Sequence, residues 1–106
     1  QVGMSYLVET TNKDEVLYAK RPLRDIYYRF VKNRKSQLTT FVTIELNKSD
    51  DKSCSLFTVY PGRVTPPTPR QGKDTPEARE FWKNHALIYK KNDVIYGTET
   101  KVCPWD

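Results

Sequence analysis

The chain has 106 residues, of which 37% are hydrophobic, 12% aromatic and 29% charged, and it carries a formal net charge of +5. This length predicts a single domain over residues 1–106 with one modest hydrophobic core, and the aromatic content argues against a disordered segment. No apolar stretch reaches the roughly 18–20 residues of a membrane-spanning helix, so we expect no membrane partner for the isolated domain.

The first third of the chain is rich in strand-forming residues. Residues 5–10 and 15–20 are short β-rich runs around the turn-forming sequence TNKD, and Arg21-Pro22 then breaks the chain. Residues 23–33 are ambiguous, because the spacing of their apolar side chains fits a helix whereas Tyr, Phe, Ile and Val favour strands. We interpret residues 26–32 as a strand, since the polar NRKS that follows is typical of a hairpin loop.

Two further strands are predicted in the middle of the chain. Residues 38–46, LTTFVTIEL, alternate between two faces, as expected of a half-buried antiparallel strand. The turn NKSDDKS separates them from a second apolar run over residues 54–60, which Pro61-Gly62 closes. With the strand at 26–32, these three successive strands and their short polar turns predict an antiparallel meander.

A proline-rich stretch and a helix follow. Residues 64–70, VTPPTPR, are expected to be extended, because proline fixes φ and disfavours helix in the residue before it. Asp74 or Thr75 can cap a helix that has Pro76 as its first residue. The side chains expected on one side of this helix are Ala78, Phe81, Trp82 and His85.

The end of the chain predicts one more hairpin. Residues 86–105 contain two strand-like runs, which we expect to turn at Asn92-Asp93 and to end in a last strand reaching Trp105. The fold class predicted from the whole pattern is therefore α+β, an antiparallel meander with one or more helices packed on it.

Most of the positive charge is concentrated in residues 18–35. This segment carries seven Lys and Arg side chains against a single acidic one, a local balance of +6 that leaves the remaining chain at −1. Cations that neutralise phosphates, interleaved with rings that stack on bases, are typical of nucleic-acid-binding surfaces; the alternative is a solvated basic surface. The predicted nucleic-acid-binding cations are Lys20, Arg21, Arg24, Lys32, Arg34 and Lys35, and the interleaved rings are Tyr18, Tyr27, Tyr28 and Phe30.

Four side chains form the candidate catalytic set. His85 is the only histidine, and imidazole is the side chain that titrates near neutral pH, although a histidine beside a helix end can also be purely structural. Thr58 and Tyr60 are two residues apart on a predicted strand, so both hydroxyls should face the same side. Arg29, on a neighbouring predicted strand, could supply positive charge beside them.

Two loop cations are candidates for holding phosphate. Arg63 follows the TVYPG turn, and Arg70 lies in the proline-rich stretch. Cations on loops suit the positioning of a phosphate backbone better than catalysis. Taken singly, each is better explained as ordinary surface charge.

The sequence offers no metal-binding or nucleotide-loop motif. It contains no Gly-rich phosphate loop, no HExxH and no nucleophile elbow. Cys54 and Cys103 are far apart, without CxxC spacing, and one histidine cannot complete a convincing zinc site with them. We therefore expect two ordinary thiols, no cofactor and no metal, with a disulfide as the alternative.

A strand that ends in LFTVYPG, a proline-rich stretch and then FWKNHALI resembles the C-terminal ribonuclease toxin domains of bacterial polymorphic and contact-dependent growth inhibition systems. The resemblance covers residues 26–88 and is strongest at TVYPG and FWKNHAL. It implies a barnase/EndoU/colicin/RelE-like architecture, an antiparallel sheet with helices packed on one side. The chain departs from EndoU-type and RNase A-like members, which use paired histidines.

The resemblance also implies a metal-independent endoribonuclease, with transfer RNA as the expected substrate. In such an enzyme a base deprotonates a ribose 2′-OH, which attacks the adjacent phosphorus, while a cation stabilises the new charge and an acid protonates the departing 5′-oxygen. In this scheme His85 transfers protons, and Arg29 stabilises the negative charge on the phosphate. Thr58 and Tyr60 orient the substrate through hydrogen bonds.

The same resemblance implies how the domain is delivered and controlled. The chain begins at Gln1, and we expect it to be the C-terminal module of a larger effector, secreted or displayed on the cell surface, that acts in the cytoplasm of a target cell. The expected partners are RNA and a cognate acidic immunity protein; a host translation factor is left open. The alternatives are a non-catalytic nucleic-acid-binding module and a basic protein-interaction domain.

Overall fold

The computed structural model describes most of the chain, and within it no helix has the length and apolar composition needed to span a bilayer. For residues 37–39, 42, 45–48 and 54–61 the description covers the backbone only. The described residues are 3–24, 26–39, 42–48, 54–61, 65–70 and 74–106.

The chain divides into two compact units. The first contains Gln1–Ser5 and Gln37–Thr65, and the second contains Tyr6–Ser36 and Pro66–Asp106. The segments of the two units therefore alternate along the sequence. Each unit has its own β-structure.

The first unit consists of two antiparallel strand pairs. Strand β1 (Gly3–Ser5) pairs with β5 (Gln37–Thr39), and β6 (Val42–Lys48) pairs with β7 (Cys54–Pro61). The pairing of β6 with β7 has an irregularity between Glu45 and Leu46. The second predicted strand, residues 54–60, is confirmed as β7, whereas the run 38–46 predicted as one strand is divided between β5 and β6. Residues 49–53 of the predicted turn lie outside the described residues.

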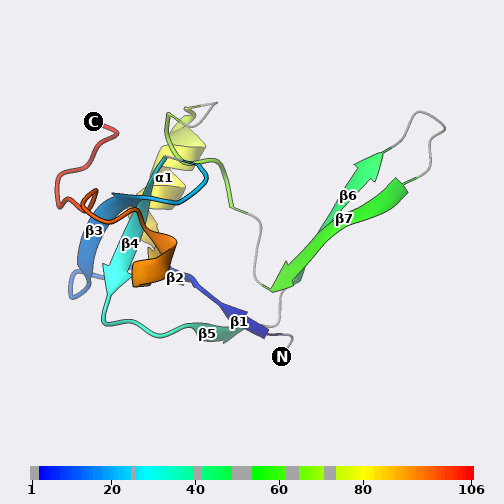
Figure 1. Cartoon of the computed structure of the whole chain (residues 1–106), viewed down its shortest axis with the longest axis horizontal. Helices are drawn as coiled ribbons and strands as arrows, with labels where there is room; N and C mark the ends of the chain where they lie inside the picture. The colour runs from blue at the N-terminus through cyan, green and yellow to red at the C-terminus, as the bar shows by residue number, and fades with distance from the viewer. Residues whose placement is uncertain (1–2, 25, 40–41, 49–53, 62–64, 71–73) are drawn as a thin grey trace. The chain divides into compact units, whose positions relative to one another are not determined.

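The second unit is a small α+β domain built on a mixed four-stranded sheet (Figure 1). Its strands are β2 (Leu7–Glu9), β3 (Glu15–Lys20), β4 (Tyr27–Lys32) and β8 (His85–Ile88), in the spatial order β2-β8-β4-β3. Strand β8 pairs antiparallel with β2 and parallel with β4. The turn between β2 and β3 thus connects strands at the two edges of the sheet.

The predicted meander is only partly correct. Strand β4 forms where residues 26–32 predicted it, but it pairs with β3 and β8 and has no ladder with β5, β6 or β7 in the described residues. The sheet is therefore mixed, not purely antiparallel. The short polar loop after β4 was interpreted as a hairpin loop. It instead connects β4 to a strand of the other unit.

Helix α1 (Pro76–Asn84) begins as the sequence predicts. Thr75 is the N-cap, and its Oγ1 accepts a hydrogen bond of 3.1 Å from the backbone N–H of Ala78. Pro76 occupies the first turn, where its missing N–H costs no intrahelical bond. Asp74 does not cap the helix and instead binds Arg79 through two hydrogen bonds of 2.8 Å.

Replacing Thr75 by alanine should lower the free energy of unfolding by about 1 kcal/mol, because the N–H of Ala78 loses its side-chain acceptor. Urea denaturation followed by circular dichroism measures the change. Thr75→Ser keeps the hydroxyl and should restore most of the loss. A serine variant as unstable as the alanine variant would show that the cap hydrogen bond is not the cause.

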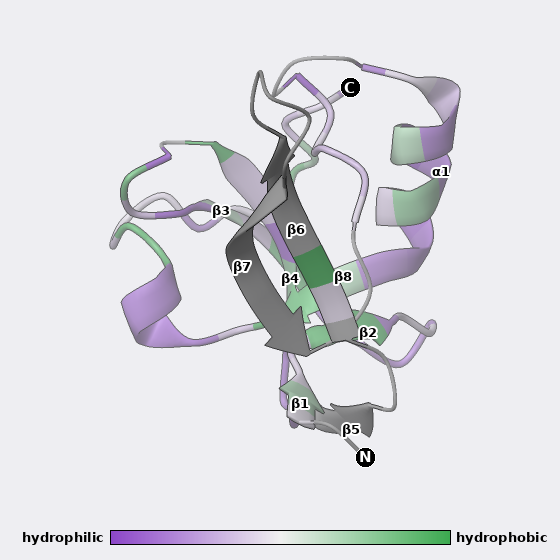
Figure 2. Ribbon diagram, turned by 90° about the vertical axis from the view of Figure 1, so that its right-hand side faces the viewer, coloured by the Kyte–Doolittle hydropathy of each residue, from purple (hydrophilic) through white to green (hydrophobic). Residues whose placement is uncertain are grey.

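The core of the second unit lies between the sheet and the apolar side of α1. Ala78 and Trp82 are buried, whereas the other side of the helix is polar, as the hydropathy colouring of Figure 2 shows. The Trp82 ring meets the Tyr28 ring edge-on at 6.2 Å between centroids, and its Nε1–H donates to the carbonyl of Pro66 at 3.2 Å. One buried cluster comprises Leu17, Ala19, Tyr28, Phe30, Trp82, Val94 and Trp105, and a second comprises Val8, Val31, Ala86 and Ile88.

The predicted C-terminal hairpin is wrong. After β8 the chain forms a short 3₁₀ helix (Lys91–Asp93), and residues 94–106, all of them described, contain no strand. Instead, Thr100 forms an isolated bridge with Tyr18 through hydrogen bonds of 2.7 and 2.8 Å. The C-terminal segment therefore lies along the free edge of β3, which brings Cys103 and Trp105 close to the sheet and α1.

Candidate functional site

A cavity of about 320 Å³ lies in the second unit where the sheet, α1 and the C-terminal segment meet. Tyr18 and Arg29 are cross-strand partners on β3 and β4, so the pairing of these strands places the two side chains together. Cys103 and Trp105 reach the same place because Thr100 is held against β3. The full lining is Tyr18, Arg29, Arg79, Trp82, Lys83, Cys103, Trp105 and Asp106.

Arg29 is held in place by two hydrogen bonds from one nitrogen. Its Nη1 donates to Thr10 Oγ1 and to the backbone carbonyl of His85, both at 3.0 Å. A guanidinium has five N–H donors in a planar fork, so those on Nη2 and Nε take no part in these two bonds. The bonds fix the orientation of the positive charge without neutralising it.

Tyr18 supplies a hydroxyl beside that charge. Burial raises the pKa of Tyr18 above its ordinary value, contact with Cys103 raises it further, and the Arg29 guanidinium opposes both effects. Burial is the largest of the three. The phenol therefore stays protonated at neutral pH and can donate a hydrogen bond to an anion.

The other two cations of the cavity differ in how far neighbouring groups compensate their charge. Arg79 is largely compensated, because it binds Asp74, donates to the carbonyl of Trp105 at 2.8 Å and lies 3.8 Å from Asp106. Lys83, one helical turn further, has no ion pair among the residues that the structure describes. Among the side chains that line the cavity, Arg29, Arg79 and Lys83 are cationic and Asp106 is acidic.

His85 is the first residue of β8 and not part of the helix. Its ring stacks on that of Phe81 at 4.0 Å, and Nδ1 lies 2.9 Å from the carbonyl of Phe81. A carbonyl only accepts, so Nδ1 carries the proton, and Nε2 is the nitrogen that can gain and lose one.

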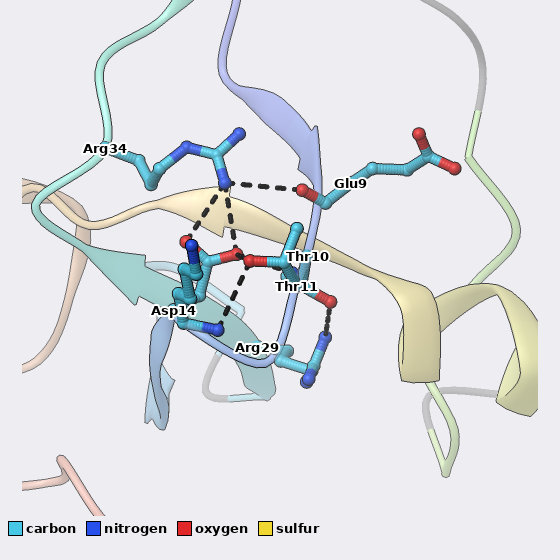
Figure 3. Close-up of polar contacts among 7 residues, drawn as sticks. Glu9, Thr10, Thr11, Asp14, Arg29 and Arg34 are labelled. Atoms are coloured by element: carbon cyan, nitrogen blue, oxygen red, sulfur yellow. Dashed lines mark hydrogen bonds and ion pairs between the residues drawn. The ribbon is translucent and has the colours of Figure 1, made fainter.

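The side chains of His85 and Arg29 lie on opposite faces of the sheet. Leu87 is the Cα partner of Phe30, and side chains alternate along a strand, so His85 shares a face with Phe30 whereas Arg29 faces the other way. Figure 3 shows the same relation through Glu9, the Cα partner of His85, whose carboxylate points away from the Arg29 guanidinium. The structure thus connects Arg29 to the backbone of His85 and not to its ring.

Glu9 is a candidate that the sequence analysis missed. It is exposed and directly opposite His85 on the antiparallel pair β2 and β8, and the Cβ atoms of such a pair are about 4.5–5.5 Å apart. A carboxylate and an imidazole on one face can exchange protons with a shared substrate. No pattern in the sequence indicated that β2 and β8 would pair, because about 75 residues separate them.

Most cations and rings of the basic segment 18–35 contact other side chains of the protein, which the composition alone does not indicate. Tyr28 and Phe30 are buried, at 7% and 1% exposure, so their rings cannot stack on bases. Arg21 lies over the Tyr28 ring at 5.2 Å, and Arg24 donates to the Tyr28 hydroxyl at 3.5 Å. Lys20 lies over the Tyr27 ring and Lys32 over the ring of Tyr89, at 5.4 and 5.9 Å, whereas Lys35 is exposed.

Arg34 belongs to a network that closes the turn after β2 (Figure 3). Its Nη1 donates to both carboxylate oxygens of Asp14, at 3.0 and 3.1 Å, and lies 3.4 Å from the carbonyl of Glu9. Asp14 also accepts from the backbone N–H of Thr11 at 2.6 Å, which confirms the predicted TNKD turn. The charge of Arg34 is thereby compensated, and less of it is available for a phosphate.

This network predicts a pH-dependent contribution to stability. The Thr11 N–H and the Arg34 guanidinium lower the pKa of Asp14 below 3.8, so its contribution is present above that pH and is lost as the pH falls through the lowered pKa. Asp14→Asn should therefore destabilise the protein at pH 7, and the difference from wild type should shrink below about pH 4.

Urea denaturation of both proteins from pH 2.5 to 7 measures this difference. Glu99→Gln removes an exposed carboxylate and is the control, with an expected change below about 0.5 kcal/mol. A difference between Asp14→Asn and wild type that stays constant over the whole range would exclude the proposed role of the charge.

The other predicted site residues are not among the described residues that line this cavity. Thr58 and Tyr60 lie on β7 in the first unit, paired in register with Glu45 and Thr43, and their side chains are outside the description. Arg63 is outside the described residues. Arg70 is exposed and has a left-handed backbone conformation, with φ of 65°.

The helical cations of the cavity could have been found from the sequence. Arg79 and Lys83 are four residues apart, and that spacing places them on one side of a helix. The thiol of Cys103 is free in the structure. No three His, Cys, Asp or Glu side chains in the described part of the chain are grouped so that they could hold a metal ion.

Comparison with known proteins adds no relative to this description: no protein-family model, curated protein or solved structure matches the chain.

Proposed function

We propose that the chain is a metal-independent endoribonuclease. The observation that carries the proposal is the environment of His85, whose ring is half-buried and oriented by Phe81, with Nε2 as its proton-exchanging atom. The basic character of the chain supports RNA as the substrate, because cations neutralise the phosphate backbone. A fold of the barnase/EndoU/colicin/RelE-like kind is part of this proposal and is compatible with a sheet bearing one helix.

The chemistry assigned to the site is transesterification. The Glu9 carboxylate takes the proton of a ribose 2′-OH, and the 2′-oxygen attacks the adjacent phosphorus. The protonated His85 ring donates from Nε2 to the departing 5′-oxygen, which leaves a 2′,3′-cyclic phosphate and a free 5′-hydroxyl. Such proton transfer typically contributes about 10²–10⁴-fold to the rate.

Arg29 has a different role in this proposal from the one predicted. Its guanidinium is on the opposite face from the His85 ring, so it is better placed to bind the RNA backbone at the cavity than to meet the reacting phosphate. Thr58 and Tyr60 remain predicted contributors on the first unit.

The test is incubation of the purified chain with total RNA in EDTA, followed by gel electrophoresis and analysis of the fragment ends. Discrete fragments with cyclic phosphate ends support the proposal, and transfer RNA fragments would support the narrower substrate. Intact RNA at high protein concentration would contradict it.

A non-catalytic RNA-binding module is the second candidate. The separation of the His85 ring from the Arg29 guanidinium favours it, because RNA cleavage needs a cation beside the proton-transferring groups. A shift of labelled RNA in a gel, with no cleavage after prolonged incubation, would support this function in place of the enzyme.

We further propose that the domain is a toxin, delivered by a larger effector into the cytoplasm of target bacteria and neutralised by an acidic immunity protein. The +6 balance of residues 18–35 supports an acidic inhibitor, because charge complementarity steers association. Growth of a bacterium that expresses the domain with and without the neighbouring open reading frame is the test. A folded domain that accumulates in the cytosol without slowing growth would contradict the toxin proposal.

A further inference from the structure

The turn that follows β3 holds a leucine in a backbone conformation that leucine disfavours. The N–H of Arg24 donates to the carbonyl of Arg21 at 3.4 Å, which makes Pro22 and Leu23 the two central residues of the turn. Leu23 has a φ of 72°, and this position of a turn favours glycine or asparagine because a Cβ atom makes the left-handed conformation costly. Its side chain is 106% exposed, so packing within the unit does not offset that cost. A strained and fully exposed leucine indicates a role outside the fold.

A second turn, Ile95–Thr98, lies against the first. The N–H of Ile95 donates to the carbonyl of Lys20 at 2.7 Å, and the N–H of Lys20 donates to Thr98 Oγ1 at 3.0 Å. Because Lys20 ends β3 and directly precedes the first turn, both turns are anchored at the same point of the sheet. Tyr96 lies within the second turn and is 96% exposed. The two turns therefore present two large apolar side chains to solvent at one end of the unit.

Two cations flank Leu23 in the first turn. Arg24 is exposed, and the Arg21 guanidinium lies over the Tyr28 ring at 5.2 Å. Neither guanidinium has an ion pair within the described part of the chain, and Asp25 lies outside that part. Tyrosine and arginine are enriched at protein interfaces, and apolar side chains beside cations are complementary to an acidic protein with an apolar patch. RNA fits this surface less well, because a phosphate backbone gains nothing from an aliphatic side chain.

The two turns are at the end of the sheet where His85 and Glu9 lie. Strand β4 begins after the first turn and runs parallel to β8, whose first residue is His85. Glu9 ends β2 and is the Cα partner of His85. Strands β4 and β8 are neighbours, and neighbouring strands are about 4.8 Å apart. A protein bound to the turns would therefore extend toward His85 and obstruct the approach of RNA to this end of the sheet.

We propose that the turns Arg21–Arg24 and Ile95–Thr98 form the docking surface for the acidic protein that neutralises the domain. The inference rests on the proposed function for the identity of this partner, and it adds the surface to which the partner binds. Leu23 and Tyr96 are the apolar anchors of the interface, and the two arginines of the first turn steer association through their charge.

The test is calorimetric titration of the whole chain with the acidic product of the neighbouring open reading frame. Leu23→Asn and Tyr96→Ala should each weaken this complex at least about tenfold, because each removes an apolar anchor. Asparagine suits the left-handed position, so Leu23→Asn should keep or raise the urea concentration at the midpoint of unfolding. Val102→Asn is the matched control: Val102 is 75% exposed but outside the two turns, and its replacement should change the affinity less than about twofold.

RNA cleavage by the domain alone separates this inference from the proposed function. Both turn variants should cleave RNA as wild type does, because neither side chain belongs to the site of His85 and Glu9. Equal affinities of wild type and both turn variants for the acidic protein would overturn the docking surface and leave the enzyme intact. Absence of a complex between wild type and this protein would also overturn it. Weaker RNA binding by Leu23→Asn, with unchanged affinity for the protein, would identify RNA as the occupant of the surface and contradict the proposal.

Discussion

Replacing His85 by alanine is expected to lower RNA cleavage by at least about 10²-fold while the fold is retained. No second histidine exists to take over the proton transfer. The described contacts of the ring are local, with Phe81 four residues earlier, so its removal should leave the sheet and the helix in place. Cleavage assays and far-ultraviolet circular dichroism on the same preparation measure both quantities.

Two further variants keep this test decisive. His85→Asn retains a donor near the Phe81 carbonyl, so a folded and inactive asparagine variant would separate chemistry from structure. Glu9→Gln should also slow cleavage, whereas Glu15→Gln, an exposed carboxylate on β3, should not. A folded alanine variant with unchanged cleavage would remove His85 from the mechanism, and failure of both His85 variants to fold would show that the residue is structural.

The replacement of Trp82 by alanine is expected to lower the free energy of unfolding by about 3–5 kcal/mol. Trp82 is 1% exposed, packs edge-on against Tyr28 and Phe81, and donates its indole N–H to the carbonyl of Pro66. The substitution opens a cavity in the cluster that holds α1 on the sheet. Because domains of this size are stable by only about 5–15 kcal/mol, much of the protein should unfold at mild urea concentrations.

Circular dichroism is the suitable probe of this unfolding, because the substitution removes one of the two tryptophans. Tyr96→Ala is the matched control: this ring is 96% exposed, and its loss should change the free energy of unfolding by less than about 0.5 kcal/mol. A loss below about 1 kcal/mol for Trp82→Ala would mean that α1 does not depend on this contact.

Features that depend on neighbouring residues could be predicted from the sequence. Thr75 and Pro76 start the helix because a cap acts within one turn. The later part of the alternating run 38–46 and the apolar run 54–60 pair as β6 and β7 because the two segments are close in sequence, whereas Leu38 and Thr39 belong to β5. The strand at residues 27–32 also follows from local preference for β-structure.

The tertiary structure alone decided which strands pair and which side chains meet. The parallel pairing of β4 with β8 joins segments more than 50 residues apart, and it places His85 and Arg29 on opposite faces, a relation that no local pattern encodes. In the same way Cys103 and Trp105 reach Tyr18 only because Thr100 fills the free edge of β3. Such contacts depend on burial and register over the whole unit, whereas a sequence pattern reports only the preferences of residues a few positions apart.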